Sequence, residues 1–126
     1  MRFTFKKEER LYGNAVLNTV YNNGKYIQTD FVKIIYIEIQ KGNSPPCRVV
    51  FSVPKRSFKK AVERNLLKRR MREIYRNHKH ILYTDLNEKE KNIHICIIYL
   101  SKEIISFDQL KDNMLKALKT LVNKLN

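Results

Sequence analysis

The sequence AVERNLLKRRMRE occupies residues 61–73, and its pattern predicts a helix that extends over residues 59–76. Leu67, Met71 and Ile74 recur at three- and four-residue steps, so they lie on one side of this helix. Apolar residues at this spacing are typical of a helix that packs one side against a core. The segment therefore predicts a helix that covers a sheet or another helix.

The other side of this helix carries a dense positive charge. Arg64, Lys68 and Arg72 follow one another at four-residue steps and stack on one face. Like charges at this spacing destabilise an isolated helix by about 0.2–0.5 kcal/mol per pair. A bound polyanion would offset this repulsion, and arginine forks onto phosphate oxygens. We interpret the face as a phosphate-binding surface rather than as solvated surface only.

The positive charge extends into the approach to the helix. Residues 55–79 hold eleven Lys or Arg and two acidic residues, and so supply nine of the fourteen net positive charges of the 126-residue chain. A chain with this charge repels itself unless an anionic partner neutralises it, and nucleic acid is the leading candidate. The residues expected to bind the nucleic acid are Lys55, Arg56, Lys59, Lys60, Arg64, Asn65, Lys68, Arg69, Arg72 and Arg76.

Three other segments predict strands. Residues 31–39 are dense in β-branched and aromatic side chains, and the break at residues 41–46 contains two prolines. Residues 47–53 form a second apolar run that ends at Pro54, and the loop length favours antiparallel pairing of these two runs. Residues 92–100 predict the third strand.

Two further helices complete the predicted order. Residues 12–22 have apolar residues near helical spacing, and Gly24 contributes to a C-terminal stop. Ser106 is a predicted N-cap of the last helix, whose apolar residues recur at three- and four-residue steps. The order of elements is therefore α-β-β-α-β-α. Because we find no repeat and no linker, we expect residues 1–126 to form one α+β domain.

The composition also bounds the surroundings of the protein. The sequence has no apolar run of about 18 residues and no signal-peptide pattern, so we expect a cytoplasmic protein that is not attached to a membrane. Cys47 and Cys96 lie far apart in or beside apolar runs, and we expect both thiols to be reduced and buried. We expect no obligate protein partner.

The acidic and histidine residues do not form a recognisable active site. Nucleases that hydrolyse phosphodiesters usually gather carboxylates around metal ions or set histidine beside lysine. The aspartates are scattered over different elements, at Asp30, Asp85, Asp108 and Asp112. His78 and His80 lie in a basic loop, where phosphate contact or solvation is favoured over metal ligation. We expect this chain to contribute no catalytic residue and no metal ligand.

Residues 61–73 resemble the Arg-Asn-Arg motif helix of the bacterial ribonuclease P protein family. Residues 51–56, FSVPKR, resemble the strand and the Lys-Lys approach that precede this helix. Residues 9–11 and 17–24 resemble the family's first helix, and the order of elements agrees over nearly the whole chain.

Two positions depart from the family's pattern. Leu66 stands where the motif usually has Arg, which removes one expected contact from the motif helix. The family's first helix tends to place two aromatic residues in a cleft; Tyr21 matches the second, whereas Leu17 occupies the first. Stacking at Leu17 should therefore be weaker.

The resemblance implies an α+β sandwich similar to the second domain of ribosomal protein S5, with a left-handed βαβ crossover, although right-handed crossovers are the general rule. It also implies a subunit of ribonuclease P that binds the catalytic RNA through the motif helix. A cleft between the sheet and the first helix would hold the 5′ leader of precursor tRNA. The chemistry would then belong to Mg²⁺ bound by the RNA subunit, and the protein itself would bind no cofactor.

The residues expected in this cleft come from the first helix and the first two strands. Residues 32, 34 and 36 share one strand face, as do residues 48, 50 and 52 of the next strand. Aromatic stacking beside positive charge suits a single strand of any sequence. The alternative is that the tyrosines are ordinary half-buried core residues. The expected leader-binding residues are Leu17, Tyr21, Ile34, Tyr36, Arg48 and Ser52.

Three other functions remain as alternatives. A ribosomal or assembly protein would share the charge and the fold, but it would not assist tRNA maturation. A metal-dependent nuclease would cleave RNA without an RNA subunit, and it would lose activity when a carboxylate is replaced. A DNA-binding role is also compatible with the charge, because phosphate contacts do not distinguish the two polymers.

Overall fold

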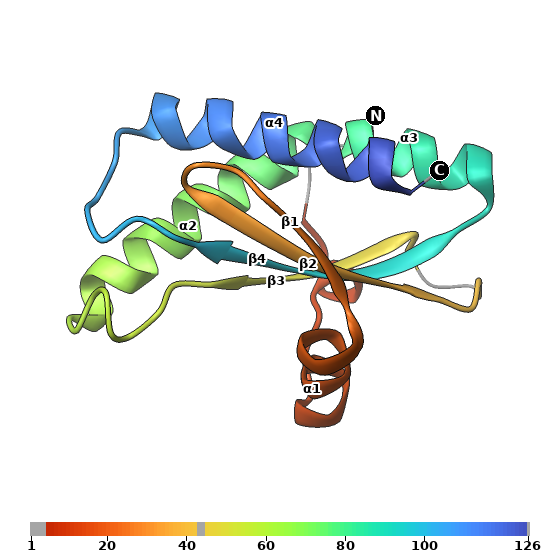
Figure 1. Cartoon of the computed structure of the whole chain (residues 1–126), viewed down its shortest axis with the longest axis horizontal. Coiled ribbons are helices and arrows are strands. Elements are labelled where there is room, and N and C mark those ends of the chain that lie inside the picture. The colour runs from red at the N-terminus through yellow and green to blue at the C-terminus, as the bar shows by residue number, and fades with distance from the viewer. Residues whose placement is uncertain (1–4, 43–44, 126) are drawn as a thin grey trace.

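The computed structural model describes residues 5–42 and 45–125, whose elements are arranged as in Figure 1. The helices are the short 3₁₀ helix η1 (Lys7–Glu9), α1 (Asn14–Asn23), α2 (Ala61–His78), α3 (His80–Lys89) and α4 (Phe107–Lys124). The strands are β1 (Lys25–Gln28), β2 (Val32–Ile39), β3 (Cys47–Ser52) and β4 (Asn92–Tyr99). All six predicted elements are present, and η1, β1 and α3 add to them.

The four strands form one mixed sheet in the order β1-β2-β4-β3. β2 is antiparallel to both of its neighbours, and β3 is parallel to β4. The predicted antiparallel pairing of the second and third strands in the chain is therefore wrong, because β4 lies between them. The reason is burial: β4 is covered on both faces, and a strand of this kind takes an interior position in a sheet.

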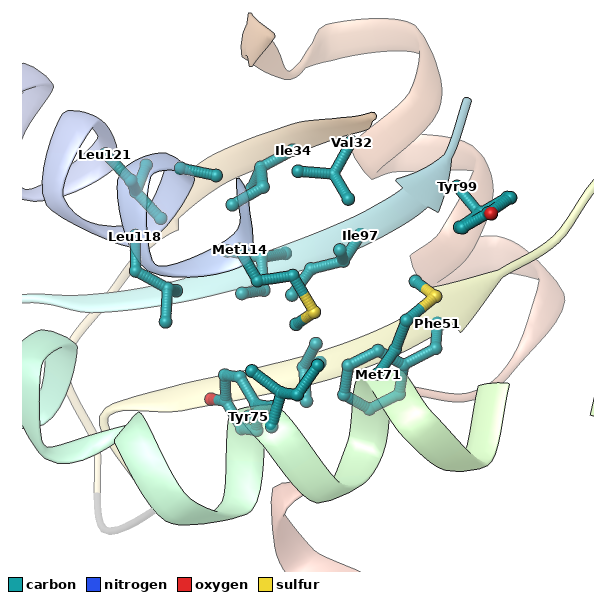
Figure 2. Packing of buried hydrophobic residues seen from close by; sticks show 14 of the residues in the cluster. Val32, Ile34, Phe51, Met71, Tyr75, Ile97, Tyr99, Met114, Leu118 and Leu121 are labelled. Carbon is teal, nitrogen blue, oxygen red and sulfur yellow. The ribbon is translucent and has the colours of Figure 1, made fainter. Parts of the chain in front are cut away.

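Helices α2, α3 and α4 cover one face of the sheet, and α1 lies against the other (Figure 1). The main core fills the space between the sheet and the first set of helices. Figure 2 shows Ile97 of β4 and Phe51 of β3 facing Met71 and Tyr75 of α2 and Met114 of α4. Each such side chain contributes roughly 1.5–3 kcal/mol when it leaves water, so this core fixes how α2 is rotated about its axis.

A smaller apolar cluster lies on the face that α1 covers. Val20 of α1 packs there with Leu11, Ile35 and Cys96, which are all buried. Cys47 is buried in the main core on the other side of the sheet, and both thiols are free, as the sequence predicted. Burial raises the pKa of Cys47 to about 12, which keeps this thiol protonated and unreactive.

The elements absent from the prediction carry weak sequence signals. β1 has four residues and buries only Ile27, so no alternation is visible. α3 buries Leu82 and Leu86, which lie one turn apart. The residues around them are largely polar, a composition that is typical of a loop between two elements. The residue that follows the helix as its C-cap, Glu90, adopts the left-handed conformation with φ 54°, where a glycine would be the usual signal of a helix end.

The predicted N-cap of α4 is confirmed. The Ser106 hydroxyl accepts a hydrogen bond from the backbone N–H of Gln109 at 3.1 Å. The Gln109 side chain in turn accepts one from the backbone N–H of Ser106 at 3.2 Å, which completes a capping box. The helix therefore begins where its sequence predicts.

The segment before α1 is fixed to β3 and to the α2–α3 junction. The backbone N–H of Leu11 donates to the carbonyl of Val49 at 2.8 Å. Glu9 is buried, and its carboxylate accepts hydrogen bonds from Lys79 Nζ and from the Tyr83 hydroxyl, each at 2.5 Å. These contacts place the N-terminal segment beside the outer edge of β3.

Candidate nucleic-acid interface

Helix α2 has the two sides that its sequence predicts. The three predicted apolar residues and Tyr75 are fully buried in the main core. Lys68 and Arg72 lie one turn apart and are partly exposed, and Asn65 and Arg69 are exposed. Because the buried side fixes the rotation of the helix, these polar side chains are held toward solvent.

The approach to α2 presents four more cations. Lys55, Arg56, Lys59 and Lys60 are all exposed, and they lie in the turns between β3 and the first residue of α2. Phe58 lies among them but points inward, where its ring centroid lies 5.7 Å from that of Tyr99. The buried ring holds the approach against the core, so the cations lie close to the N-terminal end of the helix.

Arg64 connects this approach to the helix. Its Nη1 atom donates to the carbonyl oxygens of Phe58, at 2.7 Å, and of Lys59, at 2.9 Å. The guanidinium is therefore partly used to hold the main chain that precedes α2. The sequence indicated only a phosphate contact for this residue, because a bond to the main chain has no signature in charge spacing.

Two other arginines of α2 also contact neighbouring groups. Arg76 pairs with Glu73 at 2.5 Å, and this ion pair lowers the pKa of the Glu73 carboxyl. Arg76 therefore contributes less net charge to the surface than its place in the sequence indicates. Arg70 donates to the carbonyl of Ile105 at 3.3 Å, in the loop that precedes α4.

A groove of about 220 Å³ lies between α2 and the outer edge of β3. Lys68 and Arg72 line one side of it, and Arg10 and Phe5 of the N-terminal segment line the other. The Arg10 guanidinium carbon lies 5.6 Å from the centroid of the Phe5 ring, within cation–π range. Arg10 was absent from the predicted RNA-binding residues, because only the bond from Leu11 to β3 brings it beside α2.

On the opposite side of the sheet, α1 brings Tyr21 to β3 and β4. A hydrogen bond of 3.2 Å joins Tyr21 Oη and Cys96 Sγ, and the side chain remains 46% exposed. Burial and then the bond with Cys96 raise the pKa of Tyr21 to about 12, against a smaller opposing effect of Ser52. Tyr21, Leu17 and Ser52 therefore lie on the same side of the sheet, as predicted, with the ring of Tyr21 open to solvent.

Arg48 lies on this side as well. It is the register partner of His94, one row of side chains away from Cys96. Burial and the positive charge of Arg48 lower the pKa of His94 below its ordinary value of 6.5. The imidazole is therefore neutral at pH 7, and Arg48 provides the charge of this pair.

Ile34 and Tyr36 do not lie on this side, so the prediction that they line the cleft is wrong. Both are buried in the main core on the opposite face, as the alternative interpretation of Tyr36 foresaw. Ile35 and Ile37 occupy the α1 side instead. Side-chain direction alternates along a strand, and β2 is apolar on both faces, so its pattern does not reveal which face α1 covers.

The histidines and acidic residues within the described part of the chain do not gather into a metal site. His78 ends α2, and its Nδ1 atom lies 2.9 Å from the carbonyl oxygen of Ile74, whereas His80 begins α3. Asp85 pairs with Lys89 at 2.8 Å. Residues 5–42 and 45–125 contain no group of three potential metal ligands, and none of their helices is long and apolar enough to cross a membrane.

Sequence comparison relates the chain to known proteins. The model of the family described as Ribonuclease P matches residues 5–122. The ribonuclease P protein component of Porphyromonas gingivalis is 33% identical over 116 residues, which cover 92% of this chain and 85% of that relative. The same component of Chlorobium phaeobacteroides is 32% identical over 121 residues, covering 88% and 83% of the two chains.

Structural comparison gives the same group. The RNase P protein of Thermotoga maritima aligns with a TM-score of 0.70 at 26% identity, over 89% of this chain and 96% of that one. The RNase P protein of Staphylococcus aureus aligns with a TM-score of 0.73 at 22% identity, over 90% and 94% of the two chains.

Proposed function

This chain belongs to the ribonuclease P protein family, and we propose that it is the protein subunit that assists ribonuclease P in removing the 5′ leader from precursor tRNA. One observation carries the proposal. The helix that matches the family's motif holds its cations toward solvent because its other side is buried in the main core. A rigid basic surface of this kind suits an RNA backbone of fixed shape.

We propose that α2, its approach and the groove beside β3 bind the RNA subunit. Lys68, Arg72 and Arg10 converge on this groove from two segments that are distant in the sequence. Contacts with phosphates neutralise the repulsion among these cations and release counterions from the RNA. Arg64 then has a positioning role as well, because it holds the basic approach against the helix.

We propose that the α1 side of the sheet binds the single-stranded leader. Tyr21 offers an exposed ring, Ser52 a hydroxyl group and Arg48 a positive charge. Ile37, which is partly buried, replaces Ile34 and Tyr36 in this surface, whereas Ile35 lies buried beneath α1. A ring for stacking beside a cation binds a single strand with little dependence on its sequence, which suits leaders that differ from one tRNA to another.

We further propose that the RNA subunit carries the chemistry through the Mg²⁺ ions that it binds. This chain would contribute charge screening and substrate positioning. Because the RNA partner and its substrate are made inside the cell, we place the protein in the cytoplasm. We also propose that residues 1–126 fold as one domain and that the protein has no obligate protein partner.

We infer that the fold is of the kind seen in the second domain of ribosomal protein S5, with a left-handed crossover. β3 and β4 are parallel neighbours, so the connection between them through α2 and α3 is a crossover. The family resemblance supplies the handedness, against the general preference for right-handed connections.

The test is cleavage of a precursor tRNA by the cognate ribonuclease P RNA at low Mg²⁺, with and without this protein. We expect correct 5′ processing that requires the RNA and is strongly stimulated by the protein. A lack of stimulation would indicate a general RNA-binding module, such as a ribosomal or assembly protein. Cleavage by the protein alone would indicate an active site in this chain.

A further inference from the structure

An exposed tyrosine lies on the edge strand of the sheet. Tyr26 of β1 is 61% exposed, and Lys33 of β2 places its Nζ atom 4.4 Å from the centroid of the Tyr26 ring. This distance is within the range of a cation–π contact. A single exposed tyrosine needs no special explanation, but the contact orients this ring beside a positive charge.

The strand register places this pair on the α1 side of the sheet. Tyr26 is the register partner of Ile35, which in turn is the partner of Cys96, the residue that bonds to Tyr21. Ile35 and Cys96 both belong to the cluster beneath α1. Tyr26 and Tyr21 therefore lie on the same face of the sheet, on opposite sides of this cluster.

The neighbouring row of side chains connects the same two regions. Lys33 of β2 is the partner of Ile98 of β4, which is the partner of Ser52 of β3. From β3 to β2 this row crosses two strand spacings, or about 10 Å. The row passes from the hydroxyl of Ser52 through the apolar side chain of Ile98, which is partly buried, to the cation of Lys33. A short extended segment of a nucleic acid strand can follow this row.

We propose that Tyr26 and Lys33 form a second contact for the leader of precursor tRNA, on which a base farther from the cleavage site than the one at Tyr21 stacks. Lys33 covers part of the Tyr26 ring and is placed to contact the adjacent phosphate, while the exposed part of the ring receives the base. The inference rests on the proposed function, because it extends the leader-binding surface from β3 to β1.

The test measures the affinity of the assembled ribonucleoprotein for precursor tRNAs with a very short and a long leader. We expect Tyr26→Ala to weaken binding of the long-leader substrate by at least about fivefold, the lower end of the effect of losing one base–aromatic stack. Binding of the short-leader substrate should not change. Tyr26→Phe should bind both substrates as the wild type does, because it keeps the ring.

Phe107→Ala is the matched control. Phe107 is an exposed aromatic residue at the start of α4, on the other side of the sheet, and its loss should not produce an effect that depends on leader length. Thermal unfolding of the Tyr26→Ala variant should match that of the wild type, because the side chain is largely exposed.

Two results would overturn the inference. One is an equal affinity of wild type and Tyr26→Ala for the long-leader substrate. The other is weaker binding of the RNA subunit alone by Tyr26→Ala, which would assign the contact to that RNA rather than to the leader. Either result is distinguishable from failure of the proposed function, in which the wild-type protein would not stimulate cleavage of any substrate.

Discussion

Arg64 illustrates how one side chain can serve both the fold and the interface. Its guanidinium holds the carbonyl groups of Phe58 and Lys59, and it lies on the same face of α2 as Lys68. Charge spacing alone assigns it a phosphate contact, and on that basis an alanine variant would keep an intact fold. Because Arg64 makes two hydrogen bonds to the main chain, we instead expect the alanine variant to lose order in the segment that these bonds hold.

We expect Arg64→Ala to weaken RNA binding and also to expose the approach to α2. Trypsin should cut after Lys59 and Lys60 faster than in the wild type. In the variant this segment opens at a lower cost in free energy, because there are no hydrogen bonds from Arg64 to break. Lys68→Ala is the control, since it removes one charge from the same face. Equal cleavage rates in the two variants would show that Arg64 does not hold the approach.

The two sides of helix α2 have different roles, one in packing and one in charge. The buried residues fix its place over β3 and β4, and the cations on the other side remain partly or fully exposed. Removal of a cation other than Arg64 from this side should therefore change binding without changing stability. The change in salt dependence then reports whether the lost contact was made to phosphate.

For Arg72→Gln we expect weaker binding of the RNA subunit and a slope of log K against log salt concentration that is shallower by about 0.7–0.9, the effect of one phosphate contact. Titrations of the RNA at several salt concentrations give this slope. Lys119→Gln removes an equal charge from the exposed side of α4 and should leave the slope unchanged. An unaltered slope in Arg72→Gln would contradict the assignment of α2 to the RNA.

The buried ion pair between Glu9 and Lys79 links the N-terminal segment to the α2–α3 junction. Burial alone would raise the pKa of Glu9, but the hydrogen bonds from Lys79, Tyr83 and the backbone of Lys6 outweigh it, and the pKa lies below the ordinary 4.5. The pair thereby holds the segment that carries Arg10 against the α2–α3 junction. The groove beside α2 depends on this attachment.

We expect Lys79→Met to lower the free energy of unfolding by about 3–5 kcal/mol, because it leaves the Glu9 carboxylate buried without its cation. Replacing Glu9 by Gln in the same chain should recover part of the loss. Urea unfolding at pH 7 measures both variants. A loss below about 1 kcal/mol would show that the pair is effectively solvated.

The pH dependence gives a second measurement on Glu9. Because its pKa is lower in the folded state than the ordinary 4.5, its charged form stabilises the fold above that pH, and this contribution is lost as the pH falls through the folded-state value. The difference in unfolding free energy between wild type and Glu9→Gln should therefore be constant from pH 5 to 7 and shrink in more acidic solution. A difference that does not vary with pH would exclude this role.

The sequence by itself determined the features that depend on local spacing. The apolar and basic sides of α2, the cap at Ser106 and the existence of three strands all follow from residues within one or two turns or alternations of each other. These interactions form within a single segment. Their prediction therefore requires no knowledge of what that segment packs against.

Only the tertiary structure decided how these segments meet. It placed β4 between β2 and β3, moved Ile34 and Tyr36 into the main core, and brought Arg10 beside Arg72. β2 and β4 are largely apolar on both faces, so their alternation is compatible with either orientation toward α1. The choice depends on pairing between residues distant in the chain, and that pairing is fixed by burial of the whole sheet between α1 and the other helices.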